Sequence, residues 1–310
     1  MKITKWDGKP ISKPGIYTGI PLPKYHSAEI CVGKSVSSSN LRTAWSESLA
    51  HMFDQWCCNP DRAEIEPNEG MTLGSAAHHL YLGEDNFDLS YIKQPDVYRD
   101  KVTAEEKKWT YAAGYCKDWR AKQLKAGRTI VTTAQFEKIK GMSRSLALDP
   151  LVQSGVLSGL VEHSLFVQDK ETGLWLRGRP DVIPNDGDYV DLKTAREVSD
   201  LAIWGALKSR QYHMQGALIW HIADQLGIPF NGFTLIFVET DRPYCVRACP
   251  IHDEDLSRGL LQVRAMLRRI AECIERGVWP GPGAGDLRPM PLPKTEREFI
   301  DSRIAYEDKQ

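Results

Sequence analysis

The sequence predicts an α/β (α+β) fold, with a largely helical N-terminal half followed by a central mixed sheet flanked by helices. Two observations lead to this prediction. Helix start signals and helical spacing of apolar residues dominate before about residue 150. Beyond about residue 160, alternating apolar and polar residues separated by turn residues are typical of strands. With 310 residues, 42% of them hydrophobic, the chain can form a large core.

Three parts are expected along the chain. Residues 1–35 are rich in Pro and Gly, and we expect an irregular lead-in there. Residues 36–279 contain the long periodic segments and are expected to form a single domain. Residues 280–310 are Pro-rich and then charged, which is typical of an arm or a tail.

Four helices are predicted in the N-terminal half. The first begins at a run of serines that can act as its N-cap. The third begins with the capping-box pair Thr103 and Glu106, and the fourth is stopped by the dipeptide Asp149-Pro150. Their expected ranges are about 37–58, 71–83, 103–125 and 134–148.

Strands and helices are both predicted in the C-terminal half. Three consecutive strands with short turns are expected to form an antiparallel meander. A helix, two further strands and a last helix follow, and the apolar residues of the last helix recur from Leu256 until Gly277 ends it. The expected strands cover 161–168, 174–183, 188–194, 233–239 and 244–249, and the helix between them covers about 199–226.

Charge and cysteine usage exclude several kinds of protein. The net charge of −1 predicts no general attraction to nucleic acid, so any DNA-binding surface must be local. Basic residues gather between Arg99 and Arg128, but acidic residues are interleaved and an ordinary solvated helix face is favoured. The seven cysteines form no CxxC pair, so we expect reduced thiols and no iron-sulfur cluster. No apolar run approaches the roughly 18 residues needed to cross a bilayer, and the N-terminus lacks the apolar region of a secretory signal. A cytoplasmic protein without a membrane partner is therefore expected.

The informative segment is RGRPDVIPNDGDYVDLKTA, residues 177–195. Asp191 and Lys193 are two apart on a predicted strand, so their side chains project from one face. A short hairpin would bring Asp181, at the end of the preceding strand, beside Asp191. Two carboxylates and an ammonium would then converge. A surface hairpin with an Asp191-Lys193 ion pair is the alternative.

Convergent carboxylates repel each other unless a cation neutralises them. Oxygen ligands of this kind suit Mg²⁺ or Mn²⁺. A cation bound there could contact a phosphodiester oxygen and assist attack by water. Lys193 would orient that water or neutralise the developing charge.

Longer segments carry a resemblance to a known family. P-D, about ten residues, then D-x-K on successive strands followed by a helix resembles the PD-(D/E)xK nuclease core. The segments SVSSSNLRTAWSESLAHM, LGSAAHHLYLGEDNF, ETGLWLRGRPDVI with VDLKTA, and QYHMQGALIWHI are similar to the exodeoxyribonuclease VIII (RecE) group of phage-type exonucleases. The resemblance implies a restriction-endonuclease-like core.

The resemblance also implies roles for single residues. Asp181 and Asp191 match the metal-binding acids, Lys193 the superfamily lysine, and the backbone carbonyl of Leu192 a further metal ligand. His78 matches a metal-binding histidine of this family on the helix before the sheet. Its neighbour His79 is the alternative, because adjacent helical residues point about 100° apart and cannot both face one ion.

Three further site residues are expected with less defined roles. Glu162 resembles an acid near a second metal, or is a rim residue. Tyr212 and Gln215 match a Y-x-x-Q element, in which the amide forms a hydrogen bond near the active centre and the tyrosine lies near the DNA. Packing within the helix is the alternative for both of these residues.

The expected DNA contacts lie at two places. Ser37, Ser39 and Arg42 are at a helix N-terminus, where backbone N–H groups and a guanidinium can hold a phosphate, although an N-cap also explains the serines. The resemblance implies that this phosphate is the 5′-phosphate of DNA. Arg177 and Arg179 flank the metal acids, so one of them could contact the DNA backbone, or form an ion pair with Glu162 or Asp191.

The activity implied by the resemblance is digestion of one strand of linear duplex DNA, 5′ to 3′, with one or two Mg²⁺ or Mn²⁺ ions, in phage-type recombination. A ring-shaped homo-oligomer, trimeric or tetrameric, and a single-strand annealing protein as partner are implied as well. An endonuclease or a nuclease of a defence or repair system is the alternative, as is a catalytically silent DNA-binding relative. An iron-sulfur nuclease would need four well-spaced cysteines, which the sequence lacks.

Overall fold

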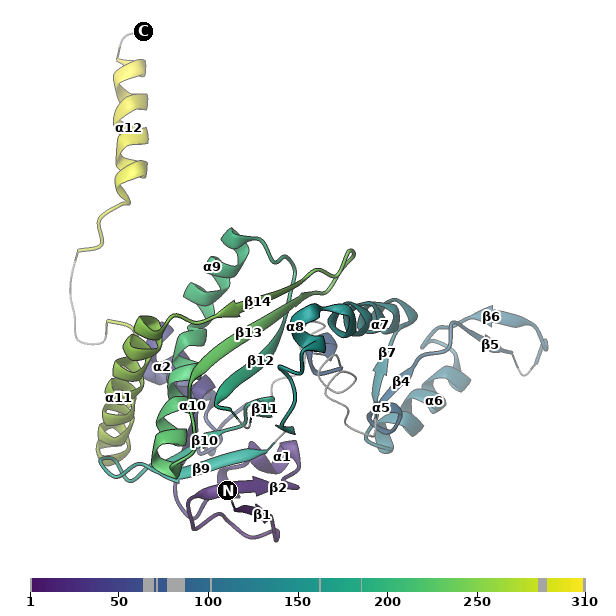
Figure 1. Cartoon of the computed structure of the whole chain (residues 1–310). Coiled ribbons are helices and arrows are strands. Elements are labelled where there is room, and N and C mark those ends of the chain that lie inside the picture. The colour runs from purple at the N-terminus through teal and green to yellow at the C-terminus, as the bar shows by residue number, and fades with distance from the viewer. Residues whose placement is uncertain are drawn as a thin grey trace.

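Two five-stranded sheets and the helices around them form the body of the molecule (Figure 1). The computed structural model describes residues 2–63, 70, 72–76, 87–100, 102–161, 163–184, 186–283 and 289–308. Within these residues, no helix is long and apolar enough to cross a membrane.

The first sheet has the strand order β1-β2-β9-β10-β3, and the second has the order β14-β13-β12-β11-β8. In the second sheet β12 and β13 are parallel, whereas the other neighbouring strands are antiparallel. The predicted mixed sheet flanked by helices is therefore confirmed. The strands of the first sheet are β1 (Ile3–Lys5), β2 (Gly15–Thr18), β3 (Ser35–Ser37), β9 (Ser164–Gln168) and β10 (Trp175–Gly178). Those of the second are β8 (Leu160–Val161), β11 (Val182–Ile183), β12 (Asp188–Ala195), β13 (Gly232–Glu239) and β14 (Val246–Pro250).

The N-terminal lead-in is not irregular throughout. β2 pairs with β9, and β1 extends the sheet beyond β2. Ile16 of β2 is 2% exposed and belongs to the main core. The apolar strand β9 needs a hydrogen-bonding partner on its second edge, and these short segments supply it. The α1 helix (Leu22–Tyr25) and the 3₁₀ turn η1 (Ala28–Ile30) follow.

The predicted meander is wrong in one respect, because its strands are divided between the two sheets. β9 pairs with β10 in the first sheet, whereas β11 pairs with β8 and β12 in the second. The chain leaves the first sheet after Gly178, which lies so close to α10 that a Cβ there would be 2.6 Å from Ile219 Cδ1. Pro180 then interrupts the ladder, since it has no N–H to donate.

Two long helices predicted from periodicity are each broken into two. The first becomes α2 (Ser38–Ser46) and α3 (Leu49–Gln55), because the Ser48 side chain accepts a hydrogen bond from the His51 N–H and caps a new helix. The second becomes α9 (Asp200–Arg210) and α10 (Tyr212–Leu226), with Gln211 in the left-handed region at φ 51°. The last periodic helix is confirmed as α11 (Asp253–Arg276), which Gly277 ends at φ 67°.

Residues of β12 alternate between two apolar clusters. Tyr189 belongs to the cluster that contains residues of α2, α10 and α11, whereas Val190 and Leu192 belong to the cluster that contains residues of α7 (Thr133–Leu148). The α7 helix, predicted at 134–148, is confirmed, and Asp149 caps the short α8 (Pro150–Gln153). Asp191 and Lys193, in the same alternation as Tyr189, therefore face α10.

A small unit stands beside the body on the side of α7 (Figure 1). The predicted helix at 103–125 is wrong over its first part. The Asp100 carboxylate accepts hydrogen bonds from the N–H groups of Val102 and Thr103, which forms a turn in place of the helix cap. The elements of this unit are α5 (Phe87–Ser90), β4 (Tyr91–Lys93), β5 (Val97–Arg99), β6 (Glu106–Lys108), α6 (Gly114–Lys125) and β7 (Thr129–Val131).

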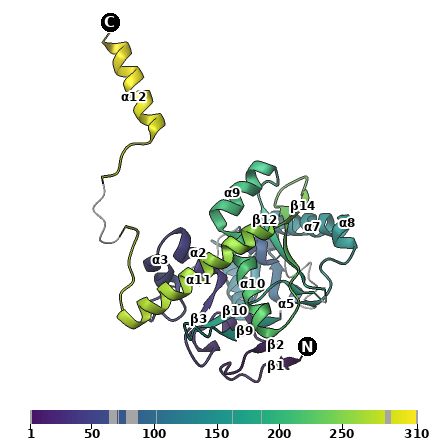
Figure 2. The same ribbon diagram turned by 60° about the vertical axis from the view of Figure 1, so that its left-hand side comes forward.

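The C-terminal segment contains the helix α12 (Lys294–Glu307). The helix stands away from the body in both ribbon views, and none of its residues is buried (Figures 1 and 2). An arm was one of the two expectations for this segment.

Candidate active site

Strand β12 places two charged side chains against helix α10. Asp191 is 2% exposed, and its carboxylate forms an ion pair with the Lys193 ammonium on the same face. Between them, the Leu192 side chain is fully buried on the opposite face, so only the backbone of Leu192 reaches this site. The alternation of the strand thus separates the core residues from the charged pair.

The hairpin of β11 and β12 brings the second carboxylate to the same place. Val182 pairs with Val190, and continuing this antiparallel register sets Asp181 opposite Asp191. The Leu192 N–H donates a hydrogen bond of 2.5 Å to Asp181 Oδ2. Asp181 is 8% exposed, so both carboxylates are nearly removed from water.

The Lys193 ammonium compensates this negative charge. Burial on its own would lower the pKa of Lys193, but the negative charges of Asp191 and Asp181 outweigh burial, and the pKa is raised. Lys193 is therefore protonated at neutral pH. Its Nζ also lies 5.3 Å from the centre of the Tyr212 ring.

Helix α10 contributes an amide and an aromatic ring. Gln215 Nε2 donates a hydrogen bond of 2.6 Å to Asp191 Oδ1. Gln215 Oε1 is buried and has no hydrogen-bond partner among the residues that the structure describes. The Tyr212 ring lies within cation-π distance of both Lys193 and Arg42, whose guanidinium carbon is 5.5 Å from the ring centre. The Y-x-x-Q pair thus contacts the charged centre.

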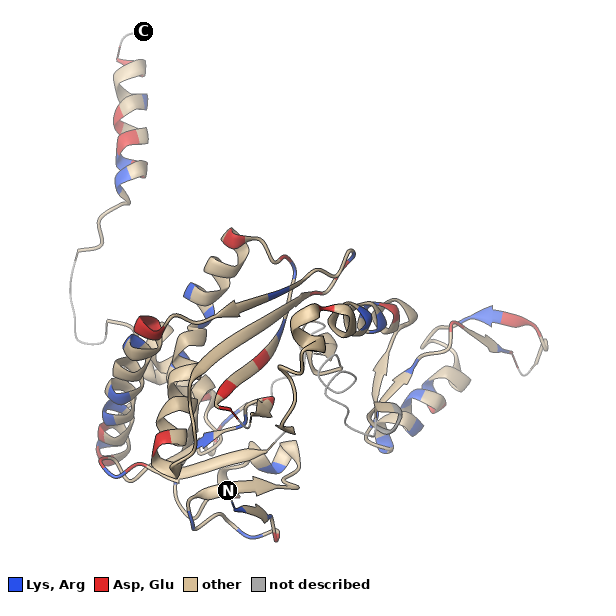
Figure 3. Ribbon diagram, viewed as in Figure 1, with Lys and Arg blue, Asp and Glu red and all other residues tan. Residues whose placement is uncertain are grey.

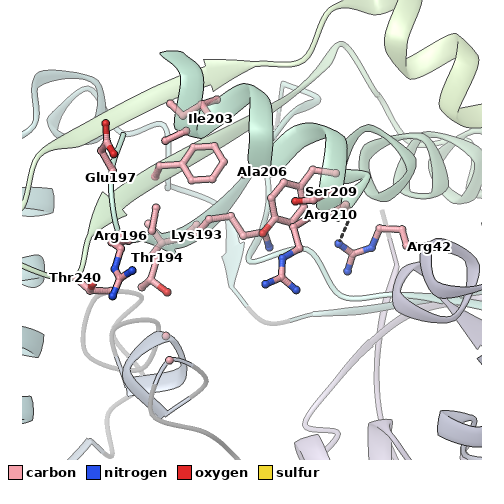
Figure 4. A pocket seen from close by; sticks show the side chains of 17 residues that line it. Arg42, Lys193, Thr194, Arg196, Glu197, Ile203, Ala206, Ser209, Arg210 and Thr240 are labelled. Carbon is pink, nitrogen blue, oxygen red and sulfur yellow. Dashed lines mark hydrogen bonds between the residues drawn. The ribbon is translucent and has the colours of Figure 1, made fainter. Parts of the chain in front are cut away.

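A cavity of about 1040 Å³ opens beside Lys193. Figure 4 shows its lining, to which β12, α9 and the N-terminal part of α2 contribute. Arg42 donates a hydrogen bond of 2.9 Å to the Arg210 carbonyl. Arg196 follows β12 directly and Arg210 ends α9, and neither was identified from the sequence. Four cations line the cavity: Arg42, Lys193, Arg196 and Arg210.

A second cavity, of about 230 Å³, includes both Asp181 and Gln215 in its lining. Ser37, Ser38 and Ser39, at the start of α2, line the same cavity. Ser37 is also the N-cap residue of a capping box, and its N–H and Oγ each donate a hydrogen bond of 3.0 Å to Asn40 Oδ1. The predicted phosphate site at the N-terminus of α2 therefore adjoins Asp181.

The two arginines of β10 and its extension differ in accessibility. Arg177 is 3% exposed and its guanidinium donates to the Tyr25 carbonyl at 2.5 Å, and it is among the residues that line the second cavity. Arg179 is half-buried, donates to the Ile20 carbonyl at 2.7 Å and lines the second cavity.

His26 also lines this cavity, and sequence reasoning missed it. Burial, together with the neighbouring Arg177 and Arg179 charges, lowers the pKa of His26 to about 4. A histidine whose pKa is lowered by burial and by arginines that are distant in the sequence has no signal in the residues around it.

The residues present fit a hard divalent cation. Asp181 and Asp191 offer oxygen ligands of the kind that Mg²⁺ and Mn²⁺ prefer, and Lys193 now supplies the positive charge beside Asp191. The predicted ligands His78 and Glu162, and the alternative His79, lie outside the described residues. Within the described part of the chain, no group of three His, Cys, Asp or Glu residues could hold a metal.

Comparison with known proteins gives one family and several chains of solved structures. A family model described as "PDDEXK-like domain of unknown function (DUF3799)" matches residues 37–287. The crystal structure of a candidate exonuclease from Eubacterium rectale is 15% identical, with a TM-score of 0.54 over 86% of this chain and 92% of that chain. For an alkaline exonuclease from Laribacter hongkongensis the identity is 13% and the TM-score 0.26, over 55% of this chain and 87% of that one. None of the curated proteins matches.

These comparisons agree with the geometry at the level of the fold. The likeness to the Eubacterium rectale protein covers most of both chains, and at this identity it shows a shared fold. The family match is of a different kind, because it spans most of the chain and includes Asp181, Asp191 and Lys193. The chain therefore belongs to the family of PDDEXK-like domains (DUF3799).

Proposed function

We propose that the protein is a deoxyribonuclease that needs a divalent metal and digests one strand of linear duplex DNA from the 5′ end. One observation carries this proposal. Asp181 and Asp191 converge beside a cavity that Lys193 and three arginines line. The aspartates can bind a metal cation and the neighbouring lysine and arginines can bind the DNA polyanion, and this combination fits phosphodiester hydrolysis.

The protein groups have distinct tasks in this reaction. Water attacks phosphorus, the bond from phosphorus to the leaving oxygen breaks, and negative charge grows on the phosphoryl oxygens. A cation held by Asp181 and Asp191 would neutralise part of that charge and make the attacking water more acidic. The Lys193 ammonium stabilises charge on the same side, and Gln215 keeps Asp191 oriented through its 2.6 Å hydrogen bond.

The second cavity supports an exonuclease over an endonuclease. Its volume of about 230 Å³ fits a terminal group better than a continuous strand, and the N-terminus of the nine-residue helix α2 with Arg179 favours a phosphate. Because Asp181 lines this cavity too, a 5′-phosphate bound there would lie close to the acids. Endonuclease activity is the second candidate, and the larger cavity alone is compatible with it.

Assembly and pathway are proposals that rest on the sequence resemblance. We propose a ring of three or four subunits with Mg²⁺ or Mn²⁺ as cofactor, acting with a single-strand annealing protein in phage-type recombination. Light scattering of the purified protein tests the assembly, since a ring requires a trimer or tetramer. A monomer at micromolar concentration would contradict it.

The activity is tested on linear duplex DNA labelled at one end, with a 5′-phosphate or a 5′-hydroxyl, in Mg²⁺, Mn²⁺ or EDTA. We expect digestion only with a metal and faster digestion of the 5′-phosphorylated end. Asp191→Ala and Lys193→Ala are expected to abolish digestion, and Arg258→Ala, an exposed change on α11, should not. Cutting of closed circles would contradict the exonuclease, and activity in the first two variants would contradict the site.

A further inference from the structure

The segment from β4 to β7, residues 91–131, is strongly basic although the whole chain is not. It contains ten Lys or Arg residues and five Asp or Glu residues, a net charge of +5. The whole chain has a net charge of −1, so all other residues together carry −6. Figure 3 shows Lys and Arg on β6 and along α6, away from the two large sheets. We call this segment the basic arm.

At least half of the ten cations of the basic arm are exposed and form no ion pair within the described part of the chain. Lys93 and Lys107 do pair with Asp96 and Asp100. Other exposed cations form no ion pair with any acidic residue in the described part of the chain, and they remain available to a polyanion. They are Lys108, Lys117, Arg120, Lys122 and Lys125.

An aromatic cluster lies among these charges. Trp109 is 8% exposed and contacts the rings of Tyr111, Tyr115 and Trp119 edge-on, with centroid distances of 6.4, 6.3 and 5.1 Å. The ring of Tyr98 stacks on that of Tyr115 at 6.2 Å. Tyr111 and Tyr115 are nevertheless 36% and 46% exposed. The buried tryptophan therefore holds two tyrosines at the surface in fixed positions.

One exposed tyrosine has a cation over its ring, and the other shares a helix face with a lysine two turns away. The Arg120 guanidinium carbon lies 5.1 Å from the centre of the Tyr111 ring. Tyr115 and Lys122 are seven residues apart on α6 and so lie on one face of the helix. Aromatic rings and cations that share one surface can bind the bases and phosphates of a nucleic-acid strand.

The base of the basic arm belongs to the apolar cluster on the face of β12 opposite to the candidate active site. Tyr91 of β4 and Val131 of β7 belong to the same apolar cluster as Leu192, whose neighbours on β12 are Asp191 and Lys193. The α7 helix continues this cluster over the sheet. A DNA strand bound to the basic arm would thus be held by a unit that shares an apolar cluster with β12, the β-strand that carries Asp191 and Lys193.

We propose that the basic arm binds single-stranded DNA, with unpaired bases stacked on Tyr111 and Tyr115 and phosphates at Arg120, Lys122 and their neighbours. Bases in a duplex are already stacked on each other, so exposed rings select an unpaired strand. The identity of that strand rests on the proposed function, because an exonuclease of this kind leaves one strand unpaired. The binding itself does not depend on cleavage.

The test measures binding of the full chain, in EDTA, to a fluorescent oligothymidylate of about 20 nucleotides. The double variant Tyr111→Ala/Tyr115→Ala is expected to bind at least about tenfold more weakly. Tyr115→Phe keeps the ring and should bind as the parent does. Tyr306→Ala removes a tyrosine that is still more exposed, at 62%, from α12 and is the control.

A second set of variants avoids any change to the aromatic cluster. Lys117→Gln, Lys122→Gln and Lys125→Gln should together make the dependence of log K on log salt shallower, by about 0.7 for each phosphate that is no longer neutralised. Lys294→Gln on α12 should leave this slope unchanged. A parent slope in the triple variant would contradict the proposal, as would unchanged affinity in the double alanine variant.

Two further results separate the basic arm from the nuclease. Equal weakening of single-stranded and duplex binding in the double alanine variant would overturn base stacking. If the parent failed to digest DNA with Mg²⁺ or Mn²⁺ while tyrosine-dependent binding persisted, the proposed function would fail and the binding site on the basic arm would stand.

Discussion

Two aspartates of equal burial, Asp169 and Asp191, each lie beside a side chain of helix α10 but have different surroundings. Each is 2% exposed. Helix α10 places His221 3.5 Å from Asp169 and Gln215 2.6 Å from Asp191. A buried carboxylate is costly unless donors or cations surround it, so both need their partners. What differs is whether a second carboxylate lies beside the first.

Asp169 is surrounded by fixed donors. Thr172 donates both its N–H, at 2.9 Å, and its hydroxyl, at 2.6 Å, and Arg264 forms an ion pair with the carboxylate. Asp191 has Lys193 and Gln215, but a second acid, Asp181, lies opposite. Asp169 therefore holds the β9-β10 hairpin to α10 and α11, whereas Asp191 shares its site with a second carboxylate, that of Asp181.

The largest effect is expected from the same substitution at the two positions. Asp191→Asn should reduce nuclease activity by a hundredfold or more, on the order expected when an electrostatic group of a reacting centre is lost. Asp169→Asn should keep most of the activity at a temperature where the variant is folded. Initial rates on 5′-phosphorylated duplex DNA measure both, and similar losses would remove the distinction between the two sites.

Stability should respond in the opposite order. Arg264→Met leaves the buried Asp169 carboxylate without its arginine partner, and we expect the free energy of unfolding to fall by about 3 kcal/mol. The matched control Arg258→Met breaks two exposed ion pairs and should cost no more than about 0.5 kcal/mol. Urea unfolding in EDTA measures both, and equal midpoints would show that the Asp169 cluster contributes little.

A smaller effect should separate orientation from charge at Asp191. Gln215→Leu removes the donor to Asp191 Oδ1 but no charge, so activity should fall about tenfold, as for one hydrogen bond of about 1.5 kcal/mol to a charged group. His221→Leu, the corresponding change beside Asp169, should leave activity unchanged. Gln215→Glu adds a third acid and should be worse than Gln215→Leu. A fully active Gln215→Leu would assign the glutamine to packing alone.

The same comparison shows how much could be predicted from sequence. Asp191 and Lys193 share a face because a strand alternates, a local rule that holds wherever the strand lies. Asp181 was placed correctly beside Asp191 because the hairpin is short. The division of the meander between two sheets could not be predicted, since it depends on the contact between Gly178 and α10.

Long-range contacts explain the other differences. Arg210 lines the cavity because helix α9 ends there. His26 comes close to the charges of Arg177 and Arg179 because the lead-in pairs with β9. Nothing in the residues around either position indicates a cavity. In the basic arm, the sequence pattern predicted a helix where the structure has a turn. The Asp100 carboxylate accepts hydrogen bonds that form this turn in place of the capping-box helix.

The smallest expected effect is on the free energy of unfolding at acid pH. Burial alone would raise the pKa of Asp169, but hydrogen bonds from His221, Thr172 and Arg264 outweigh burial and hold the pKa well below its ordinary value of 3.8. A group whose pKa is lower in the folded state stabilises the fold above its unfolded pKa and loses that contribution as pH falls through the folded pKa. The stability difference between the parent and Asp169→Asn should therefore be constant above about pH 5 and shrink steadily below about pH 4. Urea midpoints across this range measure it, and a difference that grew toward low pH would mean that Asp169 is protonated in the folded protein.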